Sequence, residues 1–268
     1  MLICADDFGL APDVDDAILQ LARAGKLSAV SVMSSLLAEP TPALKSLLEL
    51  RGQIEIGLHW VLTDETAFPP SEHIDSLHRN GRFFNFAQLQ FRSLLGRVRS
   101  ADAQRELAAQ YAWFVNLTDG TPDFVDGHMH VQQLPGVRRG LIKFIAGLPQ
   151  GERPWVRNAA EPLEHIRRRG VAPLKCWAIG NLGLALRKRL LAHGIATNAG
   201  FAGVNDYRKW QQYPDNLQRI LANVRPGNYL IMAHPGLNHP WRRAEFEALA
   251  AVTLPAGEPR HFDRKQAA

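Results

Sequence analysis

The eight residues LICADDFG, at positions 2–9, join an apolar run to two adjacent carboxylates. Leu2–Ala5 is predicted to form a buried strand, and Asp6 and Asp7 follow at its carboxyl end. A fold that binds a dinucleotide or a phosphate at this point has a glycine-rich loop with free backbone N–H groups. Carboxylates in that place argue against such a loop, so this stretch favours a barrel over an open doubly wound sheet.

Short β-branched runs alternate with amphipathic helical stretches along the rest of the chain. We predict seven strands, at Leu2–Ala5, Leu27–Ser34, Ile54–Leu58, Phe124–Asp126, Trp155–Arg157, Ile195–Ala199 and Tyr229–Ala233. We predict helices from an N-cap at Asp13 to Gly25, from Thr41 to near Gly52, and at Gln104–Leu117, Val137–Ala146, Leu163–Arg169, Leu182–His193, Asn216–Val224 and Trp241–Ala251. This alternation is typical of parallel strands covered by helices. The expected fold is therefore α/β: a (β/α)-barrel-like, incomplete or distorted seven-stranded parallel barrel.

The strand–helix series is interrupted once, between residues 60 and 100. This stretch contains Pro69-Pro70, Asn80-Gly81 and phenylalanines at positions 83, 84, 86 and 91. Insertions of this length are often functional, so we interpret it as a flap near the site, with a simple packing insertion as the alternative. We expect one catalytic domain over residues 1–255 and a polar tail at 256–268.

The composition is that of an ordinary globular protein, because 46 % of the 268 residues are hydrophobic and 21 % are charged. These fractions exclude a disordered chain, and no apolar run approaches the ~20 residues of a membrane span. Cys4 and Cys176 are too few for a disulfide framework. The N-terminus has neither the basic region nor the apolar core of a signal peptide, so we expect a cytoplasmic protein.

The formal net charge is +5, which raises the question of a nucleic-acid partner. The basic clusters at 167–169 and 187–189 fall near the ends of predicted helices, where cations complement the helix dipole. Since no nucleic-acid-binding motif accompanies them, we expect no nucleic-acid partner. The oligomeric state stays open, with a homo-oligomer among the alternatives.

Carboxylates and imidazoles follow four of the predicted strands at their carboxyl ends, and an arginine follows a fifth. In chain order these residues are Asp6, Asp7, His59, Asp126, His128, His130, Arg157 and His234. Because the carboxyl ends of parallel strands meet at one end of a barrel, we expect these side chains to converge. His128 and His130 would face the same side of an extended segment, whereas Asp6 and Asp7 would face opposite sides unless a turn reorients one of them.

One aspartate and two histidines are a common ligand set for a catalytic divalent metal. A further aspartate and histidine would then serve as general base and general acid. Taken singly, each signal has a plainer interpretation: an Asp-Asp pair after a strand is more often a helix cap, and a lone histidine is more often a structural residue.

Four motifs resemble those of one protein family, in order and at comparable spacing. They are ICADDFGL at 3–10, GLH at 57–59, DGHMHV at 126–131 and AHPG at 233–236, and they resemble the YdjC/ChbG/HpnK family of carbohydrate deacetylases. The resemblance implies a (β/α)-barrel-like fold and a metal-dependent hydrolase that removes an N-acetyl group from an amino sugar, often a chito-oligosaccharide. It also implies a divalent ion, Mg or Zn, on Asp7, His59 and His128, with Asp6 as the base and His234 as the proton donor.

One position departs from the family pattern, since Gln132 stands where the family commonly has another histidine. The departure concerns substrate contacts, for which we name His130, Arg157 and Trp60. Arg157 is expected to orient Asp6 or hold a substrate oxygen, with a surface ion pair as the alternative. For Trp60, the alternative to stacking on a sugar ring is packing of the flap onto the barrel.

Two other functions fit parts of the pattern. A metal-dependent hydrolase of another class, such as a phosphoesterase, would use the same ligands but would favour more basic residues at the strand ends. A non-catalytic sugar-binding relative would need neither Asp6 nor His234. We therefore predict a carbohydrate deacetylase acting on an N-acetylated sugar or oligosaccharide.

Overall fold

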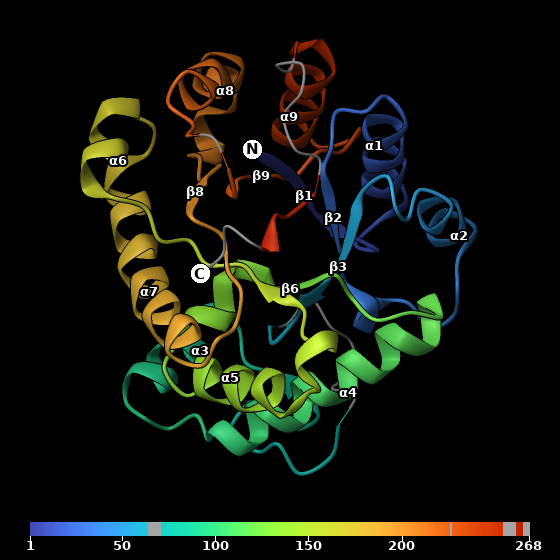
Figure 1. The fold of residues 1–268 in the computed structure, drawn as a ribbon, viewed down its shortest axis with the longest axis vertical. Helices are drawn as coiled ribbons and strands as arrows, with labels where there is room; N and C mark the ends of the chain where they lie inside the picture. Colours follow the sequence, from blue (N-terminus) through green and yellow to red (C-terminus); the bar gives the residue numbers. More distant parts are fainter. Residues whose placement is uncertain (64–70, 226, 254–260, 265–268) are drawn as a thin grey trace.

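Seven parallel strands form the centre of the fold in the computed structural model, which describes residues 1–63, 71–225, 227–253 and 261–264. The strands are β1 (Leu2–Phe8), β2 (Ala29–Val32), β3 (Glu55–Trp60), β6 (Phe124–Gly127), β7 (Trp155–Val156), β8 (Gly200–Ala202) and β9 (Tyr229–Ala233). Their order across the sheet is β7-β6-β3-β2-β1-β9-β8. Figure 1 shows this sheet surrounded by helices, which confirms the predicted α/β, incomplete barrel.

The helices that surround the sheet follow the strands in alternation. They are α1 (Pro12–Arg23), α2 (Pro42–Leu48), α4 (Ser100–Thr118), α5 (Val137–Gly147), α6 (Leu163–Arg169), α7 (Pro173–Ala192), α8 (Tyr213–Leu221) and α9 (Pro240–Ala251). Short 3₁₀ turns lie at η1 (Ser34–Leu36), η2 (His128–Gln133), η3 (Gln150–Glu152) and η4 (Tyr207–Gln212). No helix in the described ranges is long and apolar enough to cross a membrane.

The two edges of the sheet approach each other through the segment before β8. Thr197 makes an isolated parallel bridge with Val156 of β7, while β8 pairs with β9 on the other edge. The side-chain amides of Asn158 and Asn198 each donate to the backbone oxygen of the other residue across this junction. The predicted strand at 195–199 is therefore wrong, because the segment is tied to β7 mainly by side chains and the paired strand begins only at residue 200.

Alternation along the strands separates two apolar layers. Leu2, Cys4, Phe124 and Trp155 belong to the cluster inside the barrel, whereas the alternate residues of the strands pack against the helices. The interior is tight at Gly57, where an added Cβ would lie 2.5 Å from the Phe124 ring.

The tail contributes to the same interior cluster. Phe262 is buried and stacks on Trp155 with the ring centroids 4.5 Å apart. Its backbone N–H donates to Glu55 at 2.8 Å. Part of the expected polar tail is thus anchored, and residues 256–260 and 265–268 lie outside the described residues.

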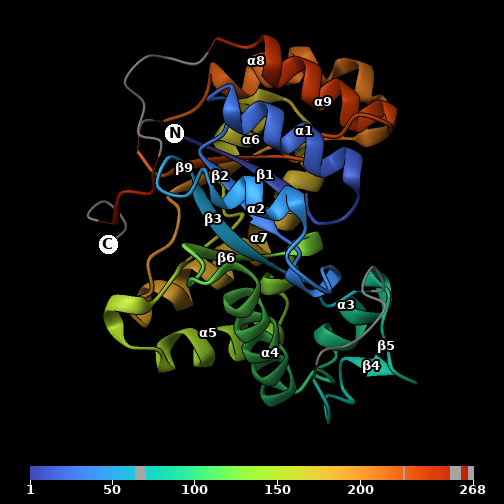
Figure 2. The same cartoon turned by 90° about the vertical axis from the view of Figure 1, so that its right-hand side faces the viewer.

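The flap folds as a small hairpin followed by a helix. The hairpin is β4 (His78–Arg79) with β5 (Arg82–Phe83), and the helix is α3 (Phe86–Leu94), which Figure 2 shows together at one side of the molecule. Asn85 caps α3 with a capping box to Gln88. Pro69-Pro70 lies outside the described residues.

The N-terminal ends of three helices can be compared with their predicted starts. Thr41 caps α2 as predicted, accepting the N–H of Leu44 at 3.1 Å. Asp13 does not cap α1, which begins at Pro12; its carboxylate instead accepts the N–H of Asn238 at 3.0 Å. Helix α7 begins at Pro173, nine residues before the predicted start at 182. The prediction missed these first turns because their apolar residues point in all directions and hide the helical period.

Candidate active site

The last inward-facing positions of the strands supply most of the site. In β1, Asp6 follows Leu2 and Cys4 on the interior face; in β6, Asp126 follows Phe124; and His234 follows β9 directly. The register pairs His59 with Asp126 and Ala5 with Ala233, so these positions lie at one level. A period of two along parallel strands therefore brings residues far apart in sequence to one end of the barrel.

Asp7 reaches the same end through an irregularity in β1. The pairing with β2 shifts between Ala5 and Phe8, and Asp7 has a left-handed backbone with φ of 71°. Aspartate tolerates this region better than most residues. The bulge meets the requirement that one of the two adjacent carboxylates be reoriented, so both belong to the site.

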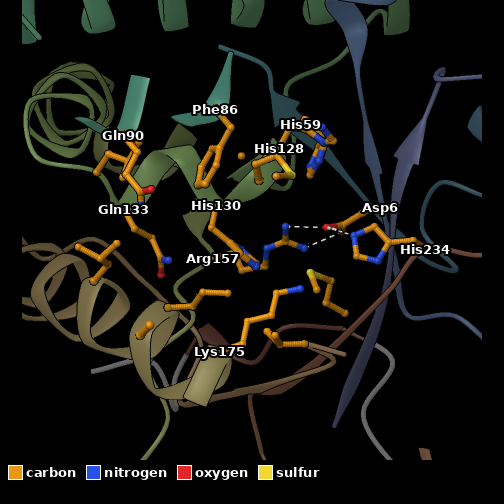
Figure 3. A pocket seen from close by; sticks show the side chains of 18 of the residues that line it. Asp6, His59, Phe86, Gln90, His128, His130, Gln133, Arg157, Lys175 and His234 are labelled. Atoms are coloured by element: carbon orange, nitrogen blue, oxygen red, sulfur yellow. Dashed lines mark hydrogen bonds and ion pairs between the residues drawn. The ribbon is translucent and has the colours of Figure 1, made fainter. Parts of the chain in front are cut away.

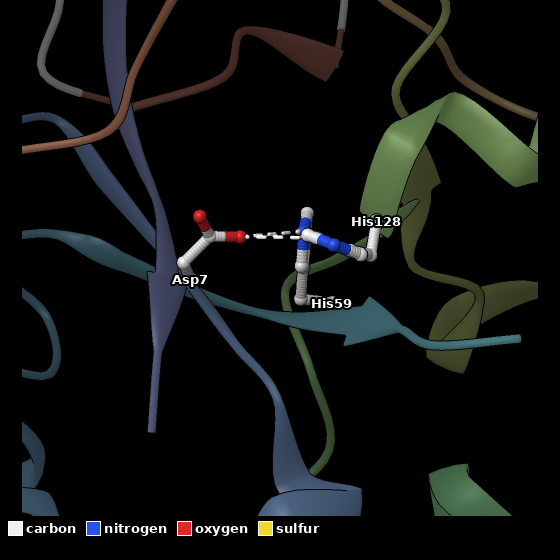
Figure 4. Close-up of side chains that lie close together, drawn as sticks. All are labelled: Asp7, His59 and His128. Carbon is white, nitrogen blue, oxygen red and sulfur yellow. Dashed lines mark hydrogen bonds and ion pairs between the residues drawn. The ribbon is translucent and has the colours of Figure 1, made fainter. Parts of the chain in front are cut away.

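Asp7, His59 and His128 converge as the resemblance implied. The Oδ1 atom of Asp7 lies 3.4 Å from Nε2 of His59 and 3.1 Å from Nδ1 of His128. One ligand atom from each residue lies within 4.8 Å of the other two, and Figure 4 shows the three side chains facing one another. This donor set, one carboxylate oxygen and two imidazole nitrogens, fits a divalent transition metal.

Groups around the three donors hold them in place. Asp126 lies 2.6 Å from Nδ1 of His59, leaving Nε2 to face Asp7, and the Ser31 hydroxyl donates to Asp126 at 2.5 Å. Arg242 donates to the other Asp7 oxygen, Oδ2, at 2.7 Å. A carboxylate behind a ligand histidine is the usual support of a protein metal site.

The electrostatics of the three donors favour a cation. Burial opposes charge on His59, but Asp126 and Asp6 outweigh it and raise the His59 pKa to about 10. Burial would also raise the pKa of Asp7, yet hydrogen bonds from His128 and His59 hold it well below its usual range. The cluster therefore attracts positive charge, which a divalent ion can supply in place of a proton.

Arg157 joins the two inward-facing aspartates. Its guanidinium donates to both oxygens of Asp6, at 2.6 and 2.7 Å, and lies 3.0 Å from Oδ2 of Asp126. Because Arg157 is completely buried, the alternative of a surface ion pair is wrong. The two-point contact fixes the plane of the Asp6 carboxylate.

His234 faces Asp6 from β9, as Figure 3 shows. Its Nε2 lies 3.9 Å from Oδ2 of Asp6, and its backbone N–H donates to Glu245 at 2.6 Å. Burial lowers the His234 pKa to about 4, which Asp7 and Asp6 only partly offset. The imidazole is therefore neutral near pH 7.

A pocket of about 320 Å³ opens over these residues. Asp6, His59, His128 and His234 lie at its base, and Figure 3 shows Phe86 and Gln90 of the flap helix on one side and Lys175 of α7 on another. The flap thus contributes to the pocket wall, as the interpretation of residues 60–100 expected. Much of the remaining lining is apolar, from Met129, Leu134, Ile179, Leu182, Val204 and Met232.

The backbone after β6 does not continue as an extended strand. The strand ends at Gly127, and Met129 and His130 have left-handed backbones with φ of 54° and 58°. The prediction that His128 and His130 lie on one side of an extended segment is therefore wrong. His130 nevertheless lines the pocket, with its ring edge-on to Phe201 at 5.5 Å.

Two other sequence expectations concern buried side chains. Trp60 is completely buried in the apolar layer and does not line the pocket, so the prediction that it stacks on a sugar is wrong. Gln132 is also completely buried, and its side chain donates to the backbone oxygen of Arg157 at 3.3 Å. The departure at position 132 therefore affects the support of Arg157 rather than the pocket surface.

Three pocket or ligand-supporting residues were missed in the sequence: Lys175, Tyr207 and Arg242. Lys175 lies on the unrecognised first turn of α7, and Tyr207 and Arg242 come from η4 and α9. For Tyr207 and Arg242 the available signal was their position after a strand end, whereas Lys175, in the middle of the connection between β7 and β8, carried no such signal. That signal does not distinguish them from ordinary surface residues.

Comparisons with known proteins place the chain in one sequence family. A family model described as YdjC-like protein matches residues 1–256. A Mus musculus carbohydrate deacetylase is 28 % identical over 253 aligned positions, covering 88 % of this chain and 77 % of its own. A Danio rerio protein of the same name is 31 % identical over 265 positions, covering 88 % and 81 %. A chitooligosaccharide deacetylase of Klebsiella pneumoniae (strain 342) is 28 % identical over 134 positions, half of each chain.

One solved structure extends the comparison to the fold. It is a protein of Enterococcus faecalis V583 with a proposed role in cellobiose-phosphate cleavage. It superposes with a TM-score of 0.61 at 18 % identity, covering 93 % of this chain and 90 % of its own. At this identity the likeness concerns the fold alone.

Proposed function

The chain belongs to the YdjC-like protein family, and from this premise we propose that it is a carbohydrate deacetylase, a metal-dependent hydrolase that removes the N-acetyl group from an amino sugar or oligosaccharide. The observation that carries the proposal is a cluster of three metal donors, two of which line the pocket, beside an aspartate–histidine pair that also lines it. Full-length relatives named carbohydrate deacetylase support the substrate class.

Asp7, His59 and His128 are the proposed ligands. When bound there, a divalent ion supplies Lewis acidity, which lowers the pKa of a water and polarises the amide carbonyl. Two imidazole nitrogens and one carboxylate suit Zn²⁺ or a similar transition metal better than Mg²⁺, which prefers oxygen ligands. We therefore favour zinc over magnesium as the working ion.

Asp6 is the proposed general base. Arg157 donates to both of its oxygens and fixes its plane, which orients it to accept the proton of the attacking water. Asp6 then returns this proton to the nitrogen as the bond between the carbonyl carbon and the nitrogen breaks. The water oxygen stays on the carbonyl carbon, and the acetic acid so formed loses its proton to solvent. Acetate and the free amino sugar result.

His234 is the proposed hydrogen-bond donor beside Asp6. The family resemblance implies a proton donor at this position, but the lowered pKa of His234 favours a neutral ring near pH 7. A neutral imidazole still donates a hydrogen bond from an N–H, and Nε2 lies beside Asp6 where the acetamido group must sit. The proposed role is to bind and orient that group and to stabilise charge that develops on it.

The test is release of acetate from a panel of N-acetylated monosaccharides and chito-oligosaccharides. The protein would be stripped with a chelator and then supplied separately with Zn²⁺, Co²⁺, Mn²⁺ and Mg²⁺. We expect equal amounts of acetate and free amine, strictly dependent on added metal. Phosphate release from sugar phosphates without any acetate release would instead support a phosphoesterase, and sugar binding without turnover would support a non-catalytic relative.

A further inference from the structure

Tyr207 contacts the side of His234 that faces away from Asp6. Its hydroxyl lies 3.3 Å from Nδ1 of His234, and the two rings meet edge to face with centroids 5.9 Å apart. Tyr207 opens the turn η4 and lines the pocket. His234 therefore has a polar partner at each ring nitrogen, a hydroxyl at Nδ1 and a carboxylate at Nε2.

The chemistry of these partners determines which nitrogen carries the hydrogen. Both oxygens of Asp6 accept hydrogen bonds from Arg157, so the carboxylate acts as an acceptor and the nitrogen beside it is favoured as N–H. Nδ1 is then an acceptor and requires a donor. Burial, together with Glu245, Asp7 and Asp6, raises the pKa of Tyr207 well above its ordinary value, so its hydroxyl keeps the proton that it donates.

Neighbouring groups hold Tyr207 itself in place. The Trp241 ring packs against it with centroids 4.4 Å apart, and the Lys175 ammonium lies 4.7 Å from the centre of its ring. Trp241 also touches His234, at 6.0 Å between centroids. These contacts come from α7 and α9, so the orientation of the hydroxyl does not depend on the short turn η4 alone.

We propose that Tyr207 is a positioning residue, whose hydroxyl donates to Nδ1 of His234 and holds the imidazole in the tautomer that presents Nε2–H to Asp6 and the pocket. The expected effect of Tyr207 on turnover rests on the deacetylase function proposed above. The assignment of the His234 tautomer does not depend on that function. The proposal assigns the hydroxyl to His234 rather than to the sugar, so its loss is expected to change kcat more than KM.

The tautomer is measured by ¹H–¹⁵N correlation of the imidazole rings in histidine-labelled protein. The signals of His234 are identified by their loss in His234→Gln among the ten histidines of the chain. We expect a protonated Nε2 and an acceptor Nδ1 in the wild type, and a downfield Nδ1 shift in Tyr207→Phe as its donor is lost. A wild-type ring protonated at Nδ1 would overturn the proposal whether or not the protein deacetylates sugars.

The kinetic arm uses Tyr207→Phe against Tyr213→Phe. Tyr213 is a buried tyrosine at the start of α8 that does not line the pocket, so its variant controls for loss of a buried hydroxyl. We expect Tyr207→Phe to lower kcat about tenfold with KM and metal content nearly unchanged, and Tyr213→Phe to keep wild-type kcat. An unchanged kcat in Tyr207→Phe, or an equal fall in both variants, would contradict the positioning role. Absence of any wild-type turnover would refute the proposed function and leave the NMR result to stand alone.

Discussion

Replacing Arg157 by methionine should destabilise the protein strongly. Arg157 is completely buried and is the cation between Asp6 and Asp126, with contacts of 2.6 to 3.0 Å. Methionine keeps much of the side chain's length but removes the two-point partner of Asp6 and leaves Asp126 with His59 alone. Removing one member of a buried ion pair costs about 3–5 kcal/mol, so we expect a loss of at least that size in the free energy of unfolding.

The assay is urea denaturation of the metal-free protein, because bound metal would add its own stabilisation. Arg168→Met is the matched control, since Arg168 pairs with Glu164 at 2.6 Å but both side chains are more than half exposed. That variant should change stability by about 0.5 kcal/mol or less. The double variant Asp6→Asn with Arg157→Met should recover part of the loss, because one unpaired charge is gone. A loss below about 1 kcal/mol in Arg157→Met would refute the buried triad as a determinant of stability.

Metal content measured on purified variants should vanish in His59→Ala and persist in His130→Ala, because only the first supplies a donor atom to the three-residue cluster; retention in both would refute the ligand assignment. Asp126→Asn should weaken the affinity for Zn²⁺ about 10–100-fold by calorimetry, since Asp126 supports the ligand from 2.6 Å behind it, and an unchanged affinity would contradict that support. Burial raises the pKa of Glu106 to about 7, so stability should fall as pH rises from 4.5 to 7. Glu106→Gln keeps the bond from Gln110, so in urea denaturation at pH 5 and pH 8 its free energy of unfolding should fall by up to about 3 kcal/mol less than that of the wild type. The same fall in both proteins would exclude Glu106 as its source.

The sheet and the interior-facing site residues were predictable because they depend on simple periods. Tyr229–Ala233 and Leu163–Arg169 match β9 and α6 at both ends, and the placement of Asp6, His59 and His234 near the carboxyl ends of strands followed from the parallel order. The family resemblance then placed Asp7 and His128 with His59. The convergence of these three side chains is what the structure adds.

The features that could not be predicted depend on three-dimensional contacts. The bulge at Asp7 and the left-handed turn at Met129 and His130 are backbone choices that side-chain patterns do not encode. Trp60 looked available because it follows His59, but alternation turns it towards the helices. Arg157 could have been an exposed ion pair in any sequence-based account, and only its position inside the barrel makes it a partner of two aspartates.

The central claim, that Asp6 takes the proton of the attacking water beside a metal held by other residues, is tested most directly with Asp6→Asn. Asparagine keeps the shape of the side chain and can still contact Arg157, but it cannot accept the proton. Acetate release and metal content would be measured on the same preparation of the variant and the wild type. The account predicts turnover reduced ~10²–10⁴-fold with metal content unchanged. Full turnover in Asp6→Asn on a substrate that the wild-type protein deacetylates would contradict it.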